Sequence, residues 1–422
     1  SFNGRRYGLD PRFRFTVSRA IYKGILRYLS FQYDRPYVVQ PLPVEAFAAQ
    51  LVDDGVRLSW HPQNDWLEPT ATPDRYIVYT RVGDGGFDNG RVVEDVTCVL
   101  PLPIDTIVSY RITAVNEGGE SFPSEILSVY RSSESKGTVL VVNGFQRVDG
   151  PAVVNTPELA GFDLLADPGV PYIGTTAYSG MQHEFARSQM TNPDEARQTG
   201  ASGDELCGTY MAGNTFDYAA VHGRSIKGAG YSFVSCSRQA FEEGVVSTQG
   251  FDIVDLFLGL QRHTDSSPMH HTPYVVVTSS LYTRLRDFTR QGGALLVSGS
   301  YLGEESQRHV PAQSLLHEVL HAVGGGHVAD WSVQGIHGLG TTLEIPRWIN
   351  PEHYPVLHPE MLSPVDGAFT PFVYEQGHGS AAVAYRGDYR SVVLGFPFEA
   401  IRSASDRDLV MSSLLDFLMC GQ

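Results

Sequence analysis

Cysteines, long apolar runs and positive charge are all scarce in this sequence. Only four cysteines occur, Cys98, Cys207, Cys236 and Cys420, and their wide spacing excludes a disulfide scaffold and a cysteine-based zinc site. No apolar run approaches the roughly 20 residues that a membrane-spanning helix requires, so we expect no membrane insertion. The net charge of −16 disfavours nucleic acids and anionic lipid surfaces as partners, because both repel an acidic protein.

What remains is a chain of 422 residues with an ordinary globular composition, long enough for about three domains. It opens at Ser1, without a methionine and without a signal peptide. We therefore expect a processed piece of a longer protein.

Residues 1–37 form a basic segment on an otherwise acidic chain. Asp10 followed by Pro11 is typical of a helix start, and apolar residues then recur at helical spacing up to about residue 29. The residues that share one side are Phe15, Ala20, Ile21, Ile25 and Leu29. The pattern predicts an ordered helix packed on its neighbour. A basic helix lying on lipid is the alternative, which the weak clustering of its charges disfavours.

Residues 44–131 show an all-β pattern with frequent turn signals. The segments VRLSW, RYIVYTRV and VSYRITAVNEGGES carry an early tryptophan, a later tyrosine and an exit turn in the order that resembles a fibronectin type III module. Such sandwiches are usually spacers, and a fold alone assigns no chemistry. A glycan-binding face on Trp66 or Phe87 is the alternative to a place for these rings in the core.

Residues 138–422 alternate short, apolar strands with helices, which predicts a doubly wound parallel sheet of Rossmann or flavodoxin-like type. The expected strands cover residues 138–145, 231–237, 251–259, 294–303 and 392–401. One expected helix carries Leu281, Leu285 and Phe288 and ends at Gly292-Gly293. Another begins with a capping box of Ser405 and Asp408. The stretches 146–230 and 331–380 are expected to be insertions at the strand ends.

Several segments carry a further resemblance. They read RRYGLDPRFRFTVSRAIYKGILRYL, GGESFPSEILSVY, TVLVVNGF, AGNTFDYAAVHGRSI, GGALLVSGSYLG and VVLGFPFEAI. Together they resemble the region downstream of the catalytic domain in secreted bacterial N-acetylmuramoyl-L-alanine amidase-like proteins, some of which carry a xanthan lyase label. The resemblance extends nearly from end to end.

This resemblance implies a cell-envelope protein of bacteria. Its zinc-amidase domain would precede Ser1, with residues 1–37 as the tail helix of that missing domain. A fibronectin module and an α/β domain of glutamine-amidotransferase or flavodoxin-like build would follow. The amidase ligands are not in the chain, so no catalytic residue is carried over, and the lyase label has no motif to support it.

The stretch HEVLHAVGGGH, residues 317–327, spells the zinc-peptidase pattern H-E-x-x-H-x-x-G-x-x-H. In that alternative His317, His321 and His327 would bind zinc and Glu318 would act as the general base, with Met361 as a methionine turn. The preferred interpretation is structural. Leu316, Val319, Leu320 and Val323 recur at i, i+3, i+4 and i+7, which predicts an ordinary helix packed on the sheet and no cofactor.

Open α/β sheets bind ligands beyond the carboxyl ends of their strands. The residues at those ends, and therefore the expected pocket, are Asn143, Gly144, Phe145, Ser298, Gly299 and Ser300. A serine hydrolase centred on Ser300 is a further alternative, although no base is recognisable beside it. Cys236 is expected to be a buried, unreactive thiol, and Glu399 faces the pocket or forms a salt bridge. His270, His271 and His378 have no ligand-type partners at useful spacing.

These patterns predict an accessory, non-catalytic region of a secreted envelope hydrolase. The region would bind or position a cell-wall glycan or another glycan ligand.

Overall fold

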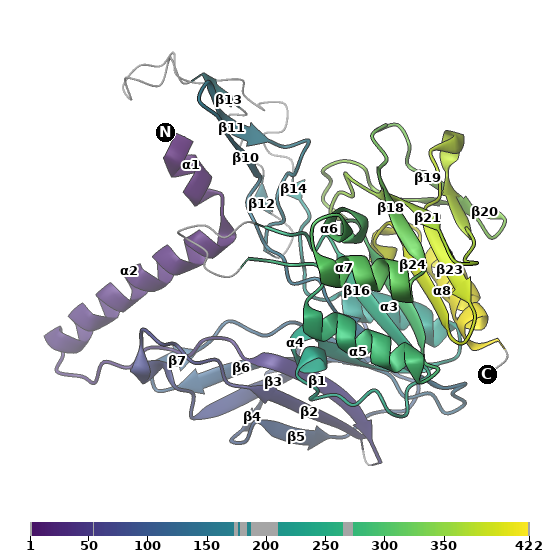
Figure 1. Ribbon diagram of the computed structural model, residues 1–422. Coiled ribbons are helices and arrows are strands. Elements are labelled where there is room, and N and C mark those ends of the chain that lie inside the picture. The colour runs from purple at the N-terminus through teal and green to yellow at the C-terminus, as the bar shows by residue number, and fades with distance from the viewer. Residues whose placement is uncertain are drawn as a thin grey trace.

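The computed structural model describes residues 2–53, 55–172, 176–177, 184–186, 210–264 and 273–420. Cys207, His270 and His271 lie outside these ranges. None of the helices within the ranges is both long and apolar enough to cross a membrane. The molecule is rich in β-structure and contains several sheets (Figure 1).

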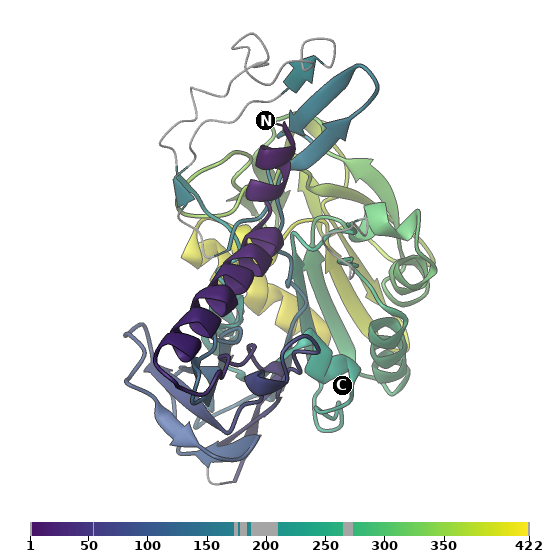
Figure 2. The same ribbon diagram turned by 90° about the vertical axis from the view of Figure 1, so that its left-hand side faces the viewer.

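Two helices open the chain, α1 (Phe2–Gly8) and α2 (Pro11–Gln32). The Asp10 carboxylate caps α2 by accepting a hydrogen bond from the backbone N–H of Arg12 at 2.8 Å. Both helices run along the outside of the molecule towards the sandwich (Figure 2). The start of α2 is therefore confirmed, and its end lies beyond the predicted residue 29.

The apolar side of α2 is mostly uncovered, although the Phe15 ring lies 5.9 Å from the ring of Phe122. Ile21, Ile25 and Leu29 are exposed, and the helix has no buried residue. Polar contacts attach α2 instead, among them the ion pair of Arg19 with Asp65 at 2.8 Å. The sequence predicted the helix correctly but predicted the wrong side as its packing surface.

Residues 44–131 fold into two facing sheets. The strands are β1 (Glu45–Val52), β2 (Gly55–His61), β3 (Arg75–Val82), β4 (Arg91–Val93), β5 (Thr97–Leu100), β6 (Val108–Asn116), β7 (Gly119–Glu120) and β8 (Leu127–Val129), with a 3-10 turn, η1 (Pro69–Ala71). β1, β2 and β5 form one sheet, while β3, β4, β6, β7 and β8 form the other. Trp60 and Tyr76 are buried between them with ring centroids 5.3 Å apart. The early tryptophan therefore points inward, as the β-sandwich pattern predicted.

Five strands of residues 138–422 pair in parallel. They are β9 (Thr138–Asn143), β15 (Ser232–Ser237), β16 (Ile253–Gly259), β17 (Ala294–Gly299) and β24 (Arg390–Leu394). Their order in the sheet is β15-β9-β16-β17-β24, and β23 (Ala382–Arg386) adds an antiparallel edge. The chain leaves β9 for β15 on one side and later returns to β16 on the other. The strand order therefore reverses between β9 and β16.

All five strands are shorter than predicted, and the largest differences are at the carboxyl ends of β17 and β24. β17 and β24 end early because short helices follow them directly, α6 (Leu302–Ser306) and η7 (Phe398–Ala400). The sequence pattern did not resolve this boundary, since apolar residues continue beyond it, at Tyr301 and Leu302 after β17 and at Phe396 and Phe398 after β24.

Helices cover both faces of the parallel strands (Figure 1). The others are α3 (Tyr218–Gly228), α4 (Arg238–Glu242), α5 (Ser279–Arg290), α7 (Val310–Ser314), the π-helical turn η5 (Leu315–Val319) and α8 (Ala404–Met419). α5 buries Leu281, Leu285 and Phe288 as predicted and ends before Gly292. α8 is capped by Ser403, which accepts from Asp406 N, so the predicted cap at Ser405 is corrected by two residues.

The sandwich and the parallel strands share one nine-stranded sheet. β1 pairs antiparallel with β15 through Ala48 opposite Cys236 and Ala49 opposite Ser235. Phe233 of β15 also stacks on Tyr130 at 6.4 Å. The ranges 44–131 and 138–422 are therefore joined by backbone hydrogen bonds and by a common core, which the sequence did not predict.

The predicted insertions fold into small sheets at the carboxyl edge of the parallel strands. The first contains β10 (Ala152–Asn155), β11 (Leu159–Asp163), β12 (Thr176–Ala177), β13 (Glu184–Ala186) and β14 (Tyr210–Met211). The second contains β19 (Gly335–Gly338), β20 (Thr341–Glu344), β21 (Glu360–Pro364), β22 (Phe372–Tyr374) and the turn η6 (Glu375–Gly377). β18 (Ala322–His327) precedes the predicted start at residue 331 and pairs with β21. Phe2 of α1 packs on Phe162 of β11, which places the N-terminal helices beside this edge.

Candidate functional site at the carboxyl edge of the parallel strands

The HEVLHAVGGGH stretch is not one helix. The helical turn ends at Val319, His321 adopts a positive φ of 50°, and residues 322–327 form strand β18. Leu316, Val319 and Leu320 are buried, but Val323 is exposed, so the predicted helical stripe stops short. The preferred helical interpretation is therefore wrong beyond the first turn. The zinc-peptidase alternative loses its helix in the same way.

The three histidines of this stretch contact different groups. The His321 Nε2 atom lies 3.0 Å from the Tyr389 hydroxyl. The His327 Nε2 atom lies 3.1 Å from a Glu304 carboxylate oxygen. His317 is exposed, as is Glu318, whose carboxylate accepts a hydrogen bond from Tyr282 at 2.8 Å. Within the described ranges, these residues do not belong to any group that could hold a metal ion.

Met361 does not support the zinc alternative either. It lies on β21, which pairs antiparallel with β18, and packs partly against the hydrophobic core.

The expected pocket residues are all buried. Asn143, Gly144, Phe145, Ser298, Gly299 and Ser300 form the core at the strand ends. A Cβ on Gly144 would meet Leu258 at 2.8 Å, so no space remains there. The Asn143 side chain donates to Glu125 of the sandwich and thereby joins the two halves of the molecule. The prediction of these residues as a pocket lining is corrected, because they lie in the core below the surface.

Ser300, Cys236 and Glu399 are also buried, whereas His378 is partly exposed. Ser300 is 0% exposed, and its hydroxyl has no hydrogen-bond partner among the described residues, so no base activates it there. Burial raises the pKa of the Cys236 thiol, which keeps it protonated. Glu399 forms an ion pair with His222 at 3.3 Å, and His378 approaches Asp330 at 3.8 Å.

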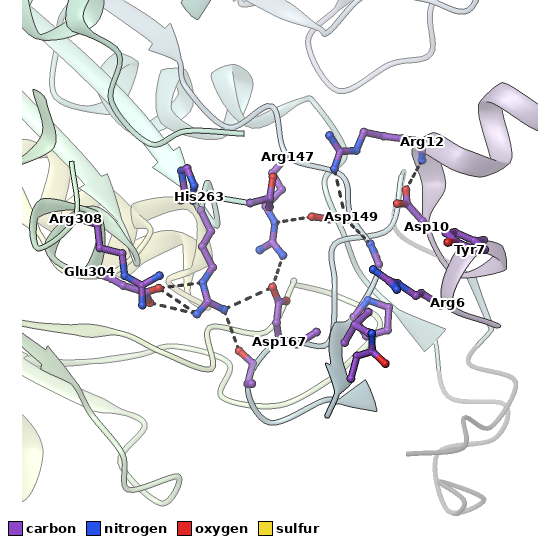
Figure 3. A pocket seen from close by; sticks show the side chains of 18 residues that line it. Arg6, Tyr7, Asp10, Arg12, Arg147, Asp149, Asp167, His263, Glu304 and Arg308 are labelled. Carbon is purple, nitrogen blue, oxygen red and sulfur yellow. Dashed lines mark hydrogen bonds and ion pairs between the residues drawn. The ribbon is translucent and has the colours of Figure 1, made fainter. Parts of the chain in front are cut away.

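A cavity of about 470 Å³ opens one layer further out, beyond the carboxyl ends of β9, β16 and β17 (Figure 3). Its lining residues are Arg6, Tyr7, Asp10, Arg12, Arg147, Asp149, Gly150, Pro151, Ala152, Val153, Asn155, Ala166, Asp167, Arg262, His263, Thr264, Glu304 and Arg308. The first four come from α1 and α2, and the rest from loops after the three strands and from β10. The cavity therefore lies at the reversal of strand order, where open α/β sheets bind ligands.

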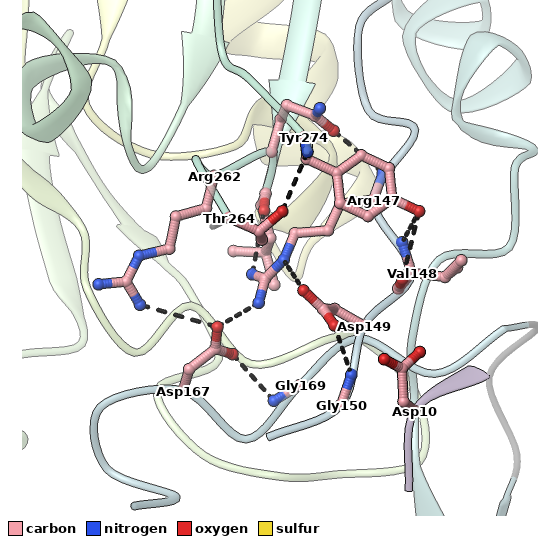
Figure 4. Close-up of polar contacts among 12 residues, drawn as sticks. Asp10, Arg147, Val148, Asp149, Gly150, Asp167, Gly169, Arg262, Thr264 and Tyr274 are labelled. Atoms are coloured by element: carbon pink, nitrogen blue, oxygen red, sulfur yellow. Dashed lines mark hydrogen bonds and ion pairs between the residues drawn. The ribbon is translucent and has the colours of Figure 1, made fainter. Parts of the chain in front are cut away.

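A chain of alternating charges crosses the floor of this cavity (Figure 4). Asp167 pairs with the fully buried Arg147 and lies 3.7 Å from Arg262. Arg262 in turn pairs with Glu304 at 3.1 Å. Each side chain is fixed by a partner of opposite sign, which makes the floor rigid and polar.

The environment fixes the protonation state of these groups. Burial alone would raise the pKa of Glu304, but the hydrogen bond from His327 and the charge of Arg262 lower it to about 2. Burial would likewise lower the pKa of Arg147, and the carboxylates of Asp167 and Asp149 raise it. Glu304 is therefore anionic and Arg147 cationic at neutral pH.

Two arginines at the rim differ from those of the floor. Arg6 lies on the α1 side and Arg308 on the α6 side of the cavity (Figure 3). Neither guanidinium has an ion pair or hydrogen bond with any residue in the described ranges, whereas Arg147 and Arg262 are both paired. Within the part of the chain that the structure describes, these two groups provide positive charge without a carboxylate partner.

The sequence did not predict the residues that line this cavity. Arg6 and Arg308 lie far apart in the chain, and their proximity depends on α1 lying against the insertion after β9. Part of the lining could have been predicted from the positions of Arg147, Arg262 and Glu304, each of which follows a predicted strand within three residues.

Trp66 and Phe87 lie elsewhere, on the sandwich. Trp66 is 91% exposed, as sugar stacking requires. Phe87 is covered by the guanidinium of Arg111, 4.3 Å above its ring. The structure therefore leaves only the first of these rings open for stacking.

Comparisons with known proteins give partial similarities. No family model matches the chain, and no curated protein does. Similar solved structures include the twitchin kinase region of C. elegans, at 22% identity and a TM-score of 0.20 over 22% of this chain and 17% of that one. The rat CD45 extracellular region, domains d3-d4, matches at 16% identity and a TM-score of 0.19, over 22% of this chain and 51% of that one.

The FN5 domain of Drosophila Lar matches at 17% identity and a TM-score of 0.18, over 22% of this chain and 98% of that domain. The chain thus spans about half or less of the twitchin and CD45 structures. Similarities at this level add nothing about function to the β-rich, multi-sheet architecture described above.

Proposed function

We propose that this chain is a ligand-binding accessory region that holds an anionic glycan fragment in the cavity at the carboxyl edge of its parallel strands. The main supporting observation is the pair of rim arginines, Arg6 and Arg308, which have no ion pair among the described residues and lie above a floor of fixed charges. The strand order supports a doubly wound, flavodoxin-like unit, in which this edge is the usual ligand position.

The lining matches the chemistry of a sugar acid better than that of an apolar ligand. Arginine forms bidentate hydrogen bonds with carboxylates, and fixed carboxylates such as Asp149 and Glu304 accept hydrogen bonds from sugar hydroxyls. Tyr7 also lines the cavity, with its ring against the Arg6 guanidinium at 5.8 Å. A cell-wall fragment with a lactyl or peptide carboxylate combines these features.

The resemblance to amidase-like envelope proteins supports a place in the bacterial cell envelope and supplies a partner. The uncovered apolar side of α2 is a surface on which a preceding amidase-like domain would pack. In this proposal the chain positions the cell-wall substrate, and the catalytic groups belong to that partner domain. No catalytic role is assigned to Glu318 or Ser300.

Isothermal titration calorimetry with muramyl dipeptide, which carries one free carboxylate, tests the proposal. Neutral N,N′-diacetylchitobiose serves as the comparison ligand. We expect binding of the first and much weaker binding of the second. Arg308→Ala and Arg6→Ala should each weaken binding about tenfold, because each removes a charge-assisted hydrogen bond.

Arg57→Ala is the matched control, since Arg57 is exposed on β2 of the sandwich, away from the cavity lining. It should bind muramyl dipeptide like the unmodified chain. Unchanged affinity in both rim variants, an equal loss in Arg57→Ala, or the absence of binding to either ligand would each refute the proposed site.

A further inference from the structure

A histidine-rich cluster lies at the wall of the cavity, apart from the HEVLHAVGGGH stretch. It contains His263, Glu305 and His309, whose potential ligand atoms all lie within 4.8 Å of one another. We propose that these three side chains form a binding site for a divalent transition-metal ion of the zinc class. The proposal rests on these residues alone and does not depend on glycan binding.

The parallel strands bring the three residues together. β16 and β17 are neighbours, so the segments that leave their carboxyl ends lie side by side. His263 follows β16, and Glu305 lies on α6, which follows β17. His309 precedes α7, and its backbone N–H donates to the Glu305 carbonyl at 2.9 Å, so the two side chains are one helical turn apart.

The distances approach those of a coordinated ion. The His263 Nδ1 atom lies 4.0 Å from a Glu305 carboxylate oxygen. Two ligands of a tetrahedral zinc ion, each about 2.0 Å from the metal, lie roughly 3.3 Å apart. Small rotations of the side chains therefore suffice to bring these atoms around a common centre.

The histidine rings are close together. Their centroids are 4.4 Å apart with an interplanar angle of 33°. Imidazole nitrogens are common ligands of transition-metal ions, and two rings this close can bind the same ion.

Glu305 requires a positive partner. It is 3% exposed, and its carboxylate accepts one long backbone hydrogen bond, from Val276 at 3.4 Å. The nearby Arg238 is engaged with Glu242 at 2.7 Å. A buried carboxylate is costly unless it is paired, and a metal ion would supply that pairing.

Two imidazoles and one carboxylate are the donor set of many zinc sites, and three protein ligands leave a position for water or a ligand group. His263 also lines the cavity, so this position would be reached from the same opening. The histidines of residues 317–327 are the other candidate zinc ligands that the sequence offers, so the experiment includes a variant that removes two of them.

The test is titration of the metal-free full chain with zinc chloride by isothermal titration calorimetry, together with thermal melting at each zinc concentration. We expect one equivalent of zinc to bind and to raise the melting temperature. His263→Ala, His309→Ala and the nearly isosteric Glu305→Gln should each weaken binding roughly 100-fold or more, since loss of a direct ligand costs at least as much as loss of its supporting groups.

A double variant His317→Ala, His321→Ala is the matched control and should bind zinc like the unmodified chain. Circular dichroism of each variant without zinc shows whether it folds, and Glu305→Gln, which preserves shape, covers the case in which an alanine variant does not. Loss of zinc binding in the control variant, retention in Glu305→Gln, or no zinc binding by the unmodified chain overturns the proposal.

Discussion

His222 is wholly buried in the centre of the parallel-strand half. Its ring lies between Asp255, 2.7 Å from Nδ1, and Glu399, 3.3 Å from Nε2, and Tyr354 donates a further hydrogen bond to Glu399. Burial alone would lower the pKa of His222, but the two carboxylates raise it from 6.5 to about 9. The protonated imidazole therefore belongs to the folded state and is a structural element rather than a catalytic one.

This arrangement predicts how the free energy of unfolding depends on pH. A histidine whose pKa is raised by folding contributes stability in full below its unfolded pKa of 6.5, and that contribution is lost as the pH rises to about 9. The loss should be on the order of 3 kcal/mol. Urea midpoints measured from pH 6 to pH 9.5 should fall accordingly, and His222→Gln should remove most of that slope.

His317→Gln provides the control for this measurement, because His317 is exposed on the helical turn η5. It should keep the slope of the unmodified chain. A flat profile in the unmodified protein, or the same slope in His222→Gln, would show that the buried imidazole is not charged in the folded state.

At the scale of elements, α2 and α5 form a contrasting pair. Both carry an apolar stripe, but Ile25 of α2 is 55% exposed while Leu285 of α5 is 0% exposed. Ile25→Asp should change the free energy of unfolding by no more than about 0.5 kcal/mol, because no packing is lost. Leu285→Asp should cost about 3 kcal/mol or more, because it buries an unpaired charge.

Denaturant midpoints of the two variants test this difference. A comparable loss in Ile25→Asp would mean that the apolar side of α2 is already covered by the chain itself. The surface proposed for a preceding domain would then not exist.

Local sequence patterns predicted the elements best where burial was uniform. The five parallel strands and the buried face of α5 follow from apolar periodicity alone. The pattern failed at residues 317–327, where Leu316, Val319 and Leu320 fit a helix but His321 turns the backbone. The three glycines that follow carry little helical preference, so pairing of β18 with β21 determines the structure there.

At the scale of the whole molecule, two features could not be predicted from local patterns. The pairing of β1 with β15 joins segments that are distant in sequence, and nothing in either strand specifies its partner. The cavity likewise depends on α1 lying against the insertion after β9, which brings Arg6 opposite Arg308. The sequence rule about strand ends predicted a site at the edge where the cavity lies, but the residues at those ends are buried and do not line it.

The location of the site is the central claim, and hydrogen–deuterium exchange with and without saturating muramyl dipeptide tests it most directly. The account predicts slower exchange in the segments after β9, β16 and β17, at residues 145–152, 260–264 and 301–308, and no change at residues 316–327. Protection centred on residues 316–327, with none in the three segments, would contradict it.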